Sequence, residues 1–178
     1  MKRLFLLCFL LPAALLHQAE PLTLARGFSD HMVLQRETLA PVWGRGEPGR
    51  TVSVKGSWNG TAVRTKVADD GFWRVDLPTS TAGGPFVLTV TSGRESLSVS
   101  DVMLGEVWVC SGQSNMEMPI RGFGFQGIDG CREILLEASG YADRIRVFDI
   151  KSDTTHFVQE DVTLRSGAAG WELTSPAV

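Results

Sequence analysis

The sequence has no excess of positive charge, few cysteines and no apolar run long enough to cross a membrane as a helix. It carries 17 Lys and Arg against 20 Asp and Glu, for a formal net charge of −3. This balance offers nothing for nucleic acid or an anionic membrane to attract. The longest apolar run, Leu4–Leu16, is too short to span a bilayer. Two of the three cysteines, Cys110 and Cys131, lie beyond that run, and two cysteines do not make a disulfide scaffold.

Residues 1–19 have the pattern of a secretory signal peptide. Lys2 and Arg3 precede the apolar run, and cleavage near Ala19 places a small residue at position −1, although His17 fits position −3 poorly. Cys8 lies inside the apolar run, which disfavours a lipoprotein anchor. We therefore expect a secreted or periplasmic protein, lysosomal or extracellular in a eukaryotic host, with no membrane contact after signal cleavage.

Residues 20–100 show the pattern of an antiparallel β-sandwich. Short alternating segments are separated by turn residues, and no helical period runs through them. Asp69-Asp70-Gly71 and Ser92-Gly93 are predicted as hairpin turns, because Gly tolerates positive φ. Trp43, Phe72 and Trp73 are expected in the core or between the sheets, with sugar stacking as an alternative role for one of them.

The pattern changes at Asp101. "VMLGEVWVC" (102–110) is nearly continuously apolar, which is typical of a strand buried on both faces of a parallel sheet. "CREILLEASG" (131–140) suits a short amphipathic helix ended by Gly140, and "RIRVFDI" (144–150) a second strand. Strand, helix, strand is the opening of an α/β domain. Residues 101–178 number 78, whereas a doubly wound domain needs well over ~100 residues, so we expect an incomplete, truncated α/β domain.

Ser114 follows that predicted strand in a tight polar turn, "SGQSNM" (111–116). Such a turn lifts a serine to the carboxyl edge of a sheet and aims backbone N–H groups at the space above it. Gly112 lets the chain turn closely, and Gln113 and Asn115 complete the turn. Met116 stands where a nucleophile elbow of the form G-x-S-x-G has its second glycine. A serine also needs a base, an orienting group for that base and oxyanion donors.

The quoted residues carry a resemblance. "GEVWVCSGQSNMEMP" (105–119), preceded by "DVML", resembles the first catalytic block of the sialate O-acetylesterase family, a branch of the SGNH hydrolases with a flavodoxin-like fold. "FSDHMVLQRETLAPVWGRGEPG" (28–49) and "AGGPFVLTV" (82–90) resemble its N-terminal β-domain, and "GWELTSPAV" (170–178) resembles the stretch before its later blocks. The resemblance implies that Ser114 attacks an acetyl ester of O-acetylated sialic acid or another acetylated glycan, with no cofactor and no metal.

The same resemblance implies catalytic partners that this sequence does not contain. The family takes its remaining oxyanion donors, and an Asp and a His three residues apart, from later blocks. We therefore expect a fragment that carries the nucleophile without its base. Asp153 and His156 have the same D-x-x-H spacing after the second predicted strand. They form an alternative base pair, set against the simpler interpretation of two solvated loop residues.

Other interpretations stay open. A non-catalytic β-sandwich module could bind a glycan or a protein partner, with Ser114 as a turn residue only. Asn59-Gly60-Thr61 is a possible glycosylation sequon and equally a type I′ turn. His31 is expected to contribute to a turn or a domain contact. A disulfide between Cys110 and Cys131 is chemically possible, although we expect Cys110 to be a small buried residue at a strand end.

Overall fold

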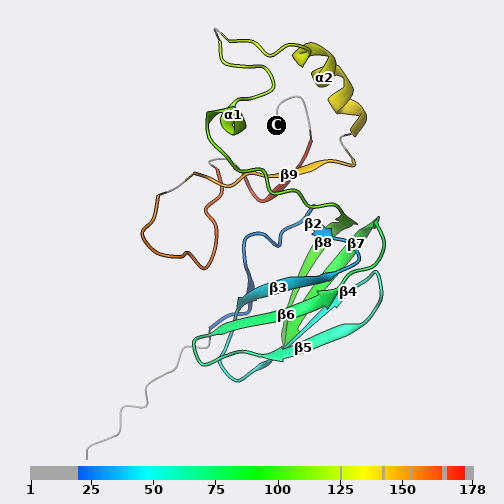
Figure 1. Ribbon diagram of the computed structural model, residues 1–178. Coiled ribbons are helices and arrows are strands. Elements are labelled where there is room, and N and C mark those ends of the chain that lie inside the picture. Colours follow the sequence, from blue (N-terminus) through cyan, green and yellow to red (C-terminus); the bar gives the residue numbers. More distant parts are fainter. Residues whose placement is uncertain (1–19, 125, 142, 153, 166–167, 175–178) are drawn as a thin grey trace, which may run out of the picture.

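The computed structural model describes residues 20–124, 126–141, 143–152, 154–165 and 168–174 (Figure 1). The predicted signal peptide (1–19) and Asp153 lie outside the described residues. The described chain is mostly strand, with few helices. In order along the chain, its elements are β1 (Thr23–Leu24), β2 (Val33–Gln35), β3 (Leu39–Arg45), β4 (Thr51–Gly56), β5 (Ala62–Lys66), β6 (Phe72–Pro78), β7 (Gly83–Ser92), β8 (Glu95–Gly105), α1 (Ser114–Glu117), α2 (Cys131–Ala138), the 3-10 turn η1 (Ser139–Tyr141), β9 (Arg146–Phe148) and β10 (Trp171–Leu173).

Strands β1 to β8 form two sheets that share one hydrophobic core. One sheet has the order β1-β3-β6 and is antiparallel. The other has the order β2-β8-β7-β4-β5, with β2 parallel to β8 and the remaining pairs antiparallel. Alternation along the strands sends every second side chain inward, as in β6, where Trp73, Val75 and Leu77 are buried while Arg74 and Asp76 are exposed. Both sheets contribute to the same buried cluster.

Of the three predicted hairpin turns, the structure confirms one and corrects two. Ser92 pairs with Glu95 across the turn at Gly93, so this hairpin is confirmed. Asn59 and Gly60 lie in the connection between the paired strands β4 and β5, but five residues separate Gly56 from Ala62, so the predicted two-residue type I′ turn is wrong. Asp69-Asp70-Gly71 is a tight turn that joins β5 to β6. It is not a hairpin, because β5 pairs with β4 and β6 with β3, in the other sheet.

The apolar run from Val102 is buried only in part. Strand β8 continues through Asp101 to Gly105, with Val102 and Leu104 in the core of the two sheets. Beyond Gly105 the chain leaves the sheet, and Trp108 and Val109 are 83% and 91% exposed. The expectation of a strand buried on both faces is therefore wrong for residues 106–110, because no described strand pairs with them and all five are exposed. The division into two domains near Asp101 stays a prediction.

The helix predicted at 131–140 and the strand predicted at 144–150 are present as α2 and β9. Their arrangement differs from the expected parallel unit, since β9 pairs antiparallel with β10, with Trp171 opposite Phe148. Figure 1 shows α1, α2 and β9 gathered on one side of the β1–β8 sheets. Neither α1 nor α2 has a buried residue. No helix among the described residues is long and apolar enough to cross a membrane.

Candidate active site

Ser114 is the first residue of α1, a single helical turn at the end of the exposed segment that follows β8. The Gln113 carbonyl accepts hydrogen bonds from Met116 N–H at 2.8 Å and Glu117 N–H at 3.3 Å. The Ser114 carbonyl accepts one from Met118 N–H at 3.1 Å. Among the described residues, the N–H groups of Ser114 and Asn115 donate to no acceptor. The turn therefore presents an exposed serine hydroxyl beside two backbone donors.

Gly112 fits this turn for a steric reason. A Cβ atom at position 112 would lie 2.5 Å from Met116 Cγ, which is closer than van der Waals contact allows. The side chain of Met116 thus folds back over position 112. Because Gly112 has no side chain, the backbone can turn there without a clash. Gln113 is the N-cap residue of α1, and its side chain makes no capping hydrogen bond. Gln113 and Asn115 are both exposed.

The structure does not test the alternative base pair. His156 is exposed and lies in the loop between β9 and β10, while Asp153 is outside the described residues. The Ser114 hydroxyl has no hydrogen-bond partner among the described residues, so no activating base is placed beside it there. In the described part of the chain, no group of three or more His, Cys, Asp or Glu side chains is arranged to hold a metal ion.

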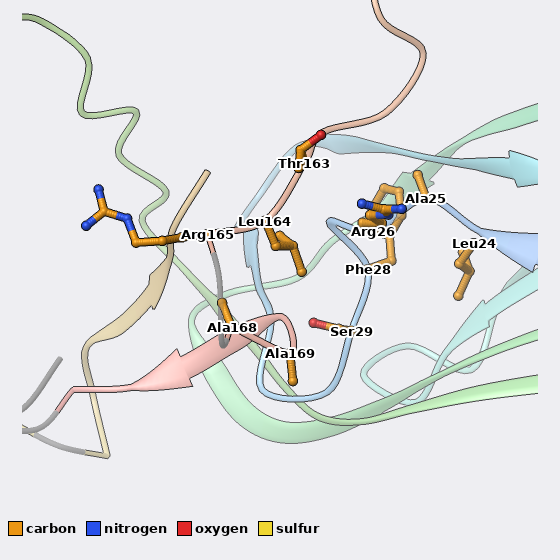
Figure 2. Close-up of a pocket in the computed structure, with 10 residues that line it drawn as sticks. All are labelled: Leu24, Ala25, Arg26, Phe28, Ser29, Thr163, Leu164, Arg165, Ala168 and Ala169. Atoms are coloured by element: carbon orange, nitrogen blue, oxygen red, sulfur yellow. The ribbon is translucent and has the colours of Figure 1, made fainter. Parts of the chain in front are cut away.

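Two open hollows lie beside Phe28, away from the serine turn. The larger has a volume of about 450 Å³ and lies between the loop after β1 and the segment before β10. Figure 2 shows Leu164, Ser29 and Ala169 around it, while the Arg165 side chain points away. The smaller hollow, of about 420 Å³, is lined by residues of β1, the loop after it and β8. Ser114 lines neither hollow.

The cysteine expectations are corrected in part. Cys110 is exposed and lies outside any strand, so the prediction of a small buried residue at a strand end is wrong. Cys131 is partly buried at the start of α2, and both thiols are free. Asn59 is exposed, as a glycosylation site must be. Its side chain accepts a hydrogen bond from Thr61 N–H and donates one to the Pro78 carbonyl.

The sequence did not reveal a polar cluster where the N-terminal loop meets β8 and β9. His31 Nδ1 lies 2.6 Å from Asp101 Oδ2, and Arg146 Nη2 lies 3.0 Å from Asp101 Oδ1. The hydrogen bond with His31, reinforced by Arg146, holds the pKa of the Asp101 carboxyl below its usual value. His31 lies in a turn, which is one of the two roles expected of it. No local signal joins the three residues, since Arg146 lies 45 residues from Asp101 and 115 from His31.

The chain was compared with family models, with curated proteins and with solved structures, and the last two comparisons both find acetylesterases. A scan against protein-family models finds no match. The chain is 40% identical to the sialate O-acetylesterase of Homo sapiens over 101 residues, which is 52% of this chain and 19% of that protein. It is 33% identical to the sialate O-acetylesterase of Mus musculus over 143 residues, or 75% of this chain and 25% of that protein.

A solved structure extends the match to three dimensions. The chain superposes on a carbohydrate acetylesterase from Xanthomonas citri with a TM-score of 0.72 and 31% identity. The match covers 87% of this chain and 33% of that one. The chain thus spans a fifth to a third of the length of these relatives. The sequence and the fold agree, and the chain belongs to the sialate O-acetylesterase family.

Proposed function

We propose that this chain is the nucleophile-bearing part of a secreted carbohydrate O-acetylesterase that removes acetyl groups from sialic acids. The carrying observation is the exposed Ser114 on a tight turn, in a chain whose relatives are acetylesterases. In this proposal β1–β8 form a β-sandwich domain, and the residues beyond it open an SGNH-type hydrolase domain. Secretion is supported by the basic and apolar pattern of residues 1–19.

The proposed reaction proceeds through an acyl-enzyme. The Ser114 hydroxyl attacks the acetyl carbonyl while a base removes its proton, and the carbonyl oxygen becomes an oxyanion. The N–H groups of Ser114 and Asn115 are free to stabilise that oxyanion. When the intermediate collapses, the sugar hydroxyl leaves with a proton returned by the base. Water then attacks the acetyl-serine ester, which releases acetate and restores the hydroxyl.

The base is the part of this mechanism that is not seen beside Ser114 among the described residues. No described group is hydrogen-bonded to the Ser114 hydroxyl. Loss of a triad base costs on the order of 10⁴-fold or more in rate. We therefore propose that the base and its orienting carboxylate come from segments equivalent to the part of the relatives that this chain does not cover.

The test measures acetate release from O-acetylated sialic acid and from an acetylated plant polysaccharide. The 178-residue chain should stay at the background of its Ser114→Ala variant. The same chain fused to the part of the Mus musculus relative outside the aligned stretch should release acetate, and Ser114→Ala should abolish that activity. Preference between the two substrates identifies the sugar class.

Two outcomes contradict the proposal. Activity of the fused protein that survives Ser114→Ala would remove Ser114 from the mechanism. Activity of the 178-residue chain that is lost in both Ser114→Ala and His156→Ala would assign the base role to His156 and overturn the need for further segments. Arg74→Ala, which breaks an exposed ion pair with Asp76 on β6, is the control for nonspecific effects.

A further inference from the structure

The serine turn belongs to an excursion that leaves the β sheets and returns to them. We define this serine excursion as residues 106–145: it begins after Gly105, the last residue of β8, and ends before Arg146, the first residue of β9. Its first residues are highly exposed, with Trp108 at 83% and Val109 at 91%. Its helices α1 and α2 bury no residue. Packing within the excursion therefore does little to fix Ser114 in space.

The base of the excursion is closed by one buried side chain. The Arg146 guanidinium forms an ion pair with the Asp101 carboxylate at 3.0 Å, and Asp101 lies on β8, four residues before that strand ends. Arg146 Nη1 also donates to the His31 carbonyl at 2.9 Å and to the Asp101 carbonyl. The Arg146 side chain is only 4% exposed. The residue directly after the excursion is thus clamped to the strand from which the excursion departs.

The receiving surface on the sheets has an unusual backbone. His31 and Asp101 have φ values of 67° and 52°, in the left-handed region that non-glycine residues seldom occupy. These conformations cost free energy and persist where surrounding structure enforces them. Both carbonyls accept from Arg146, and the His31 imidazole holds the Asp101 carboxylate at 2.6 Å. The strained pair therefore forms a receptor with three acceptors for a single guanidinium.

We propose that Arg146 is a positioning residue for Ser114: by binding the His31–Asp101 receptor it closes the base of the serine excursion and holds the nucleophile in a fixed place relative to the β sheets. That Ser114 acts as a nucleophile rests on the proposed function. The positional claim does not, because it concerns where residues 106–145 lie and not what they catalyse.

Other contacts to the sheets cannot replace this clamp. Arg45 pairs with Glu160 at 2.8 Å, but Glu160 is 79% exposed, and exposed ion pairs stabilise weakly. The Trp171 indole donates to the Gly27 carbonyl at 2.9 Å, yet Trp171 comes 26 residues after the excursion ends. Arg146 is the first of these contacts after Ser114. At its start the excursion is held by Val107 N–H, which donates to Gln35 Oε1 at 2.9 Å. Releasing Arg146 would lengthen the loop that runs from Val107 to the next attachment, which widens the volume that Ser114 can explore.

The experiment measures the distance between the excursion and the sheets by double electron–electron resonance. In a chain of residues 20–178, one spin label is placed on Cys110, which is exposed, and the other on Lys66→Cys of β5. Cys131→Ser then leaves Cys110 as the single native thiol of that chain. The parent chain should give a narrow distance distribution. Arg146→Ala should broaden it about twofold or more, because opening of the clamp is no longer opposed.

Three companion variants show whether the guanidinium itself is responsible. Arg146→Lys keeps the charge but lacks the planar fork that reaches several acceptors, so it should give an intermediate width. Arg146→Met keeps apolar volume alone and should match Arg146→Ala. Arg74→Ala removes an exposed arginine from the β6 pair with Asp76 and should leave the narrow distribution unchanged.

An unchanged distribution in Arg146→Ala would overturn the inference, and so would full rescue by Arg146→Met, which would make the side chain a space filler. Loss of the near-ultraviolet aromatic signal of the sheets in Arg146→Ala and Arg146→Lys would also overturn it, since the clamp is assigned to the excursion and not to the stability of β1–β8. The distances are read without substrate. A chain that never cleaves an ester can therefore still pass or fail this test.

Discussion

Gly44 lies on β3, opposite Leu24 of β1. A Cβ atom at position 44 would sit 1.9 Å from the Thr23 carbonyl oxygen and 2.9 Å from the Trp73 ring. Backbone atoms of a neighbouring strand cannot move aside as a side-chain end can. We expect Gly44→Ala to lower the free energy of unfolding by about 1–3 kcal/mol, the usual cost of overpacking. Urea denaturation of the mature chain measures this change.

Gly27→Ala provides the matched control for this prediction. No atom lies within 4 Å of the position that a Cβ would take at Gly27. Its expected effect is within about 0.5 kcal/mol, as for most exposed substitutions. Equal destabilisation by the two variants would contradict the steric argument at Gly44.

The Asp101 carboxylate makes the clamp at β9 sensitive to acid. Its pKa is depressed by the hydrogen bond with His31 and by Arg146. A carboxyl whose pKa is lower in the folded than in the unfolded state stabilises the fold above its unfolded pKa of about 3.9, and this contribution is lost as pH falls through the folded pKa. We expect stability to decline below about pH 4, and Asp101→Asn to reduce that decline while lowering stability at pH 7.

Urea midpoints between pH 7 and pH 3 test the acid dependence. The pKa of Asp30 is lowered by hydrogen bonds from Ser100, and that of Glu106 by Gln35 and Arg36, so some acid sensitivity should remain in Asp101→Asn. A pH profile of Asp101→Asn parallel to that of the parent would show that Asp101 does not contribute.

At the scale of elements, the strands of the two sheets and the serine excursion differ in how well their backbone is protected. Residues of β4 and β5, which carry Lys55 and Arg64, pair with each other above the common core, and β4 also pairs with β7. The excursion exposes Arg132 and Arg144 and buries no helical residue. Trypsin should therefore cut the folded chain after Arg132 or Arg144 before it cuts after Lys55 or Arg64, as followed by mass spectrometry over time.

The control for this digestion is the same chain in denaturing urea, where protection by structure is lost and all four sites should be cut at similar rates. Early cleavage after Lys55 or Arg64 in the folded chain would contradict the expected protection of the sheets.

The elements also show what sequence patterns can and cannot predict. Alternation located the strands correctly, because it reports which side chains face a core, and that requirement is local. It misjudged the Asp69–Gly71 turn, because alternation does not say which neighbour a strand pairs with, and β5 and β6 pair in different sheets. The apolar run from Val102 predicted burial throughout, yet burial of Trp108 and Val109 requires covering segments that no residue window reveals.

The candidate site was predictable to the same extent. The turn around Ser114 was found from residues that adjoin it in sequence, and the structure begins α1 at that serine. The receptor for Arg146 was missed, because its parts come from a loop, the middle of β8 and the start of β9. Positive φ at His31 and Asp101 leaves no mark on composition or periodicity. Sequence reasoning thus located the candidate serine and overlooked the contacts that we propose position it.

At the scale of the whole molecule, apolar burial is concentrated in one part of the chain. Among the described residues, the buried apolar side chains all lie between Leu22 and Leu104. The exposed large apolar residues lie almost entirely after Gly105, with Leu39 and Val87 as the exceptions before it. Because apolar burial is the dominant favourable contribution to folding, residues 20–105 carry nearly all of the stability of the described chain.

This distribution sets where the chain can be cut and still fold. The change of sequence pattern placed a boundary at residue 100, whereas β8 runs to Gly105 and places Val102 and Leu104 in the core at 0% and 2% exposure. Three residues beyond position 100, Met103, Leu104 and Gly105, also pair with β2. A chain of residues 20–105 should therefore fold and unfold cooperatively in urea.

A chain of residues 20–100 should not fold in the same way. It loses two fully buried side chains, each contributing about 1.5–3 kcal/mol, together with the only pairing that β2 makes in the described sheets. Against a typical total of about 5–15 kcal/mol, that loss leaves little or no net stability. Circular dichroism in the near and far ultraviolet compares the two chains. If both unfold with the same urea midpoint, the end of β8 does not belong to the core, and the boundary returns to residue 100.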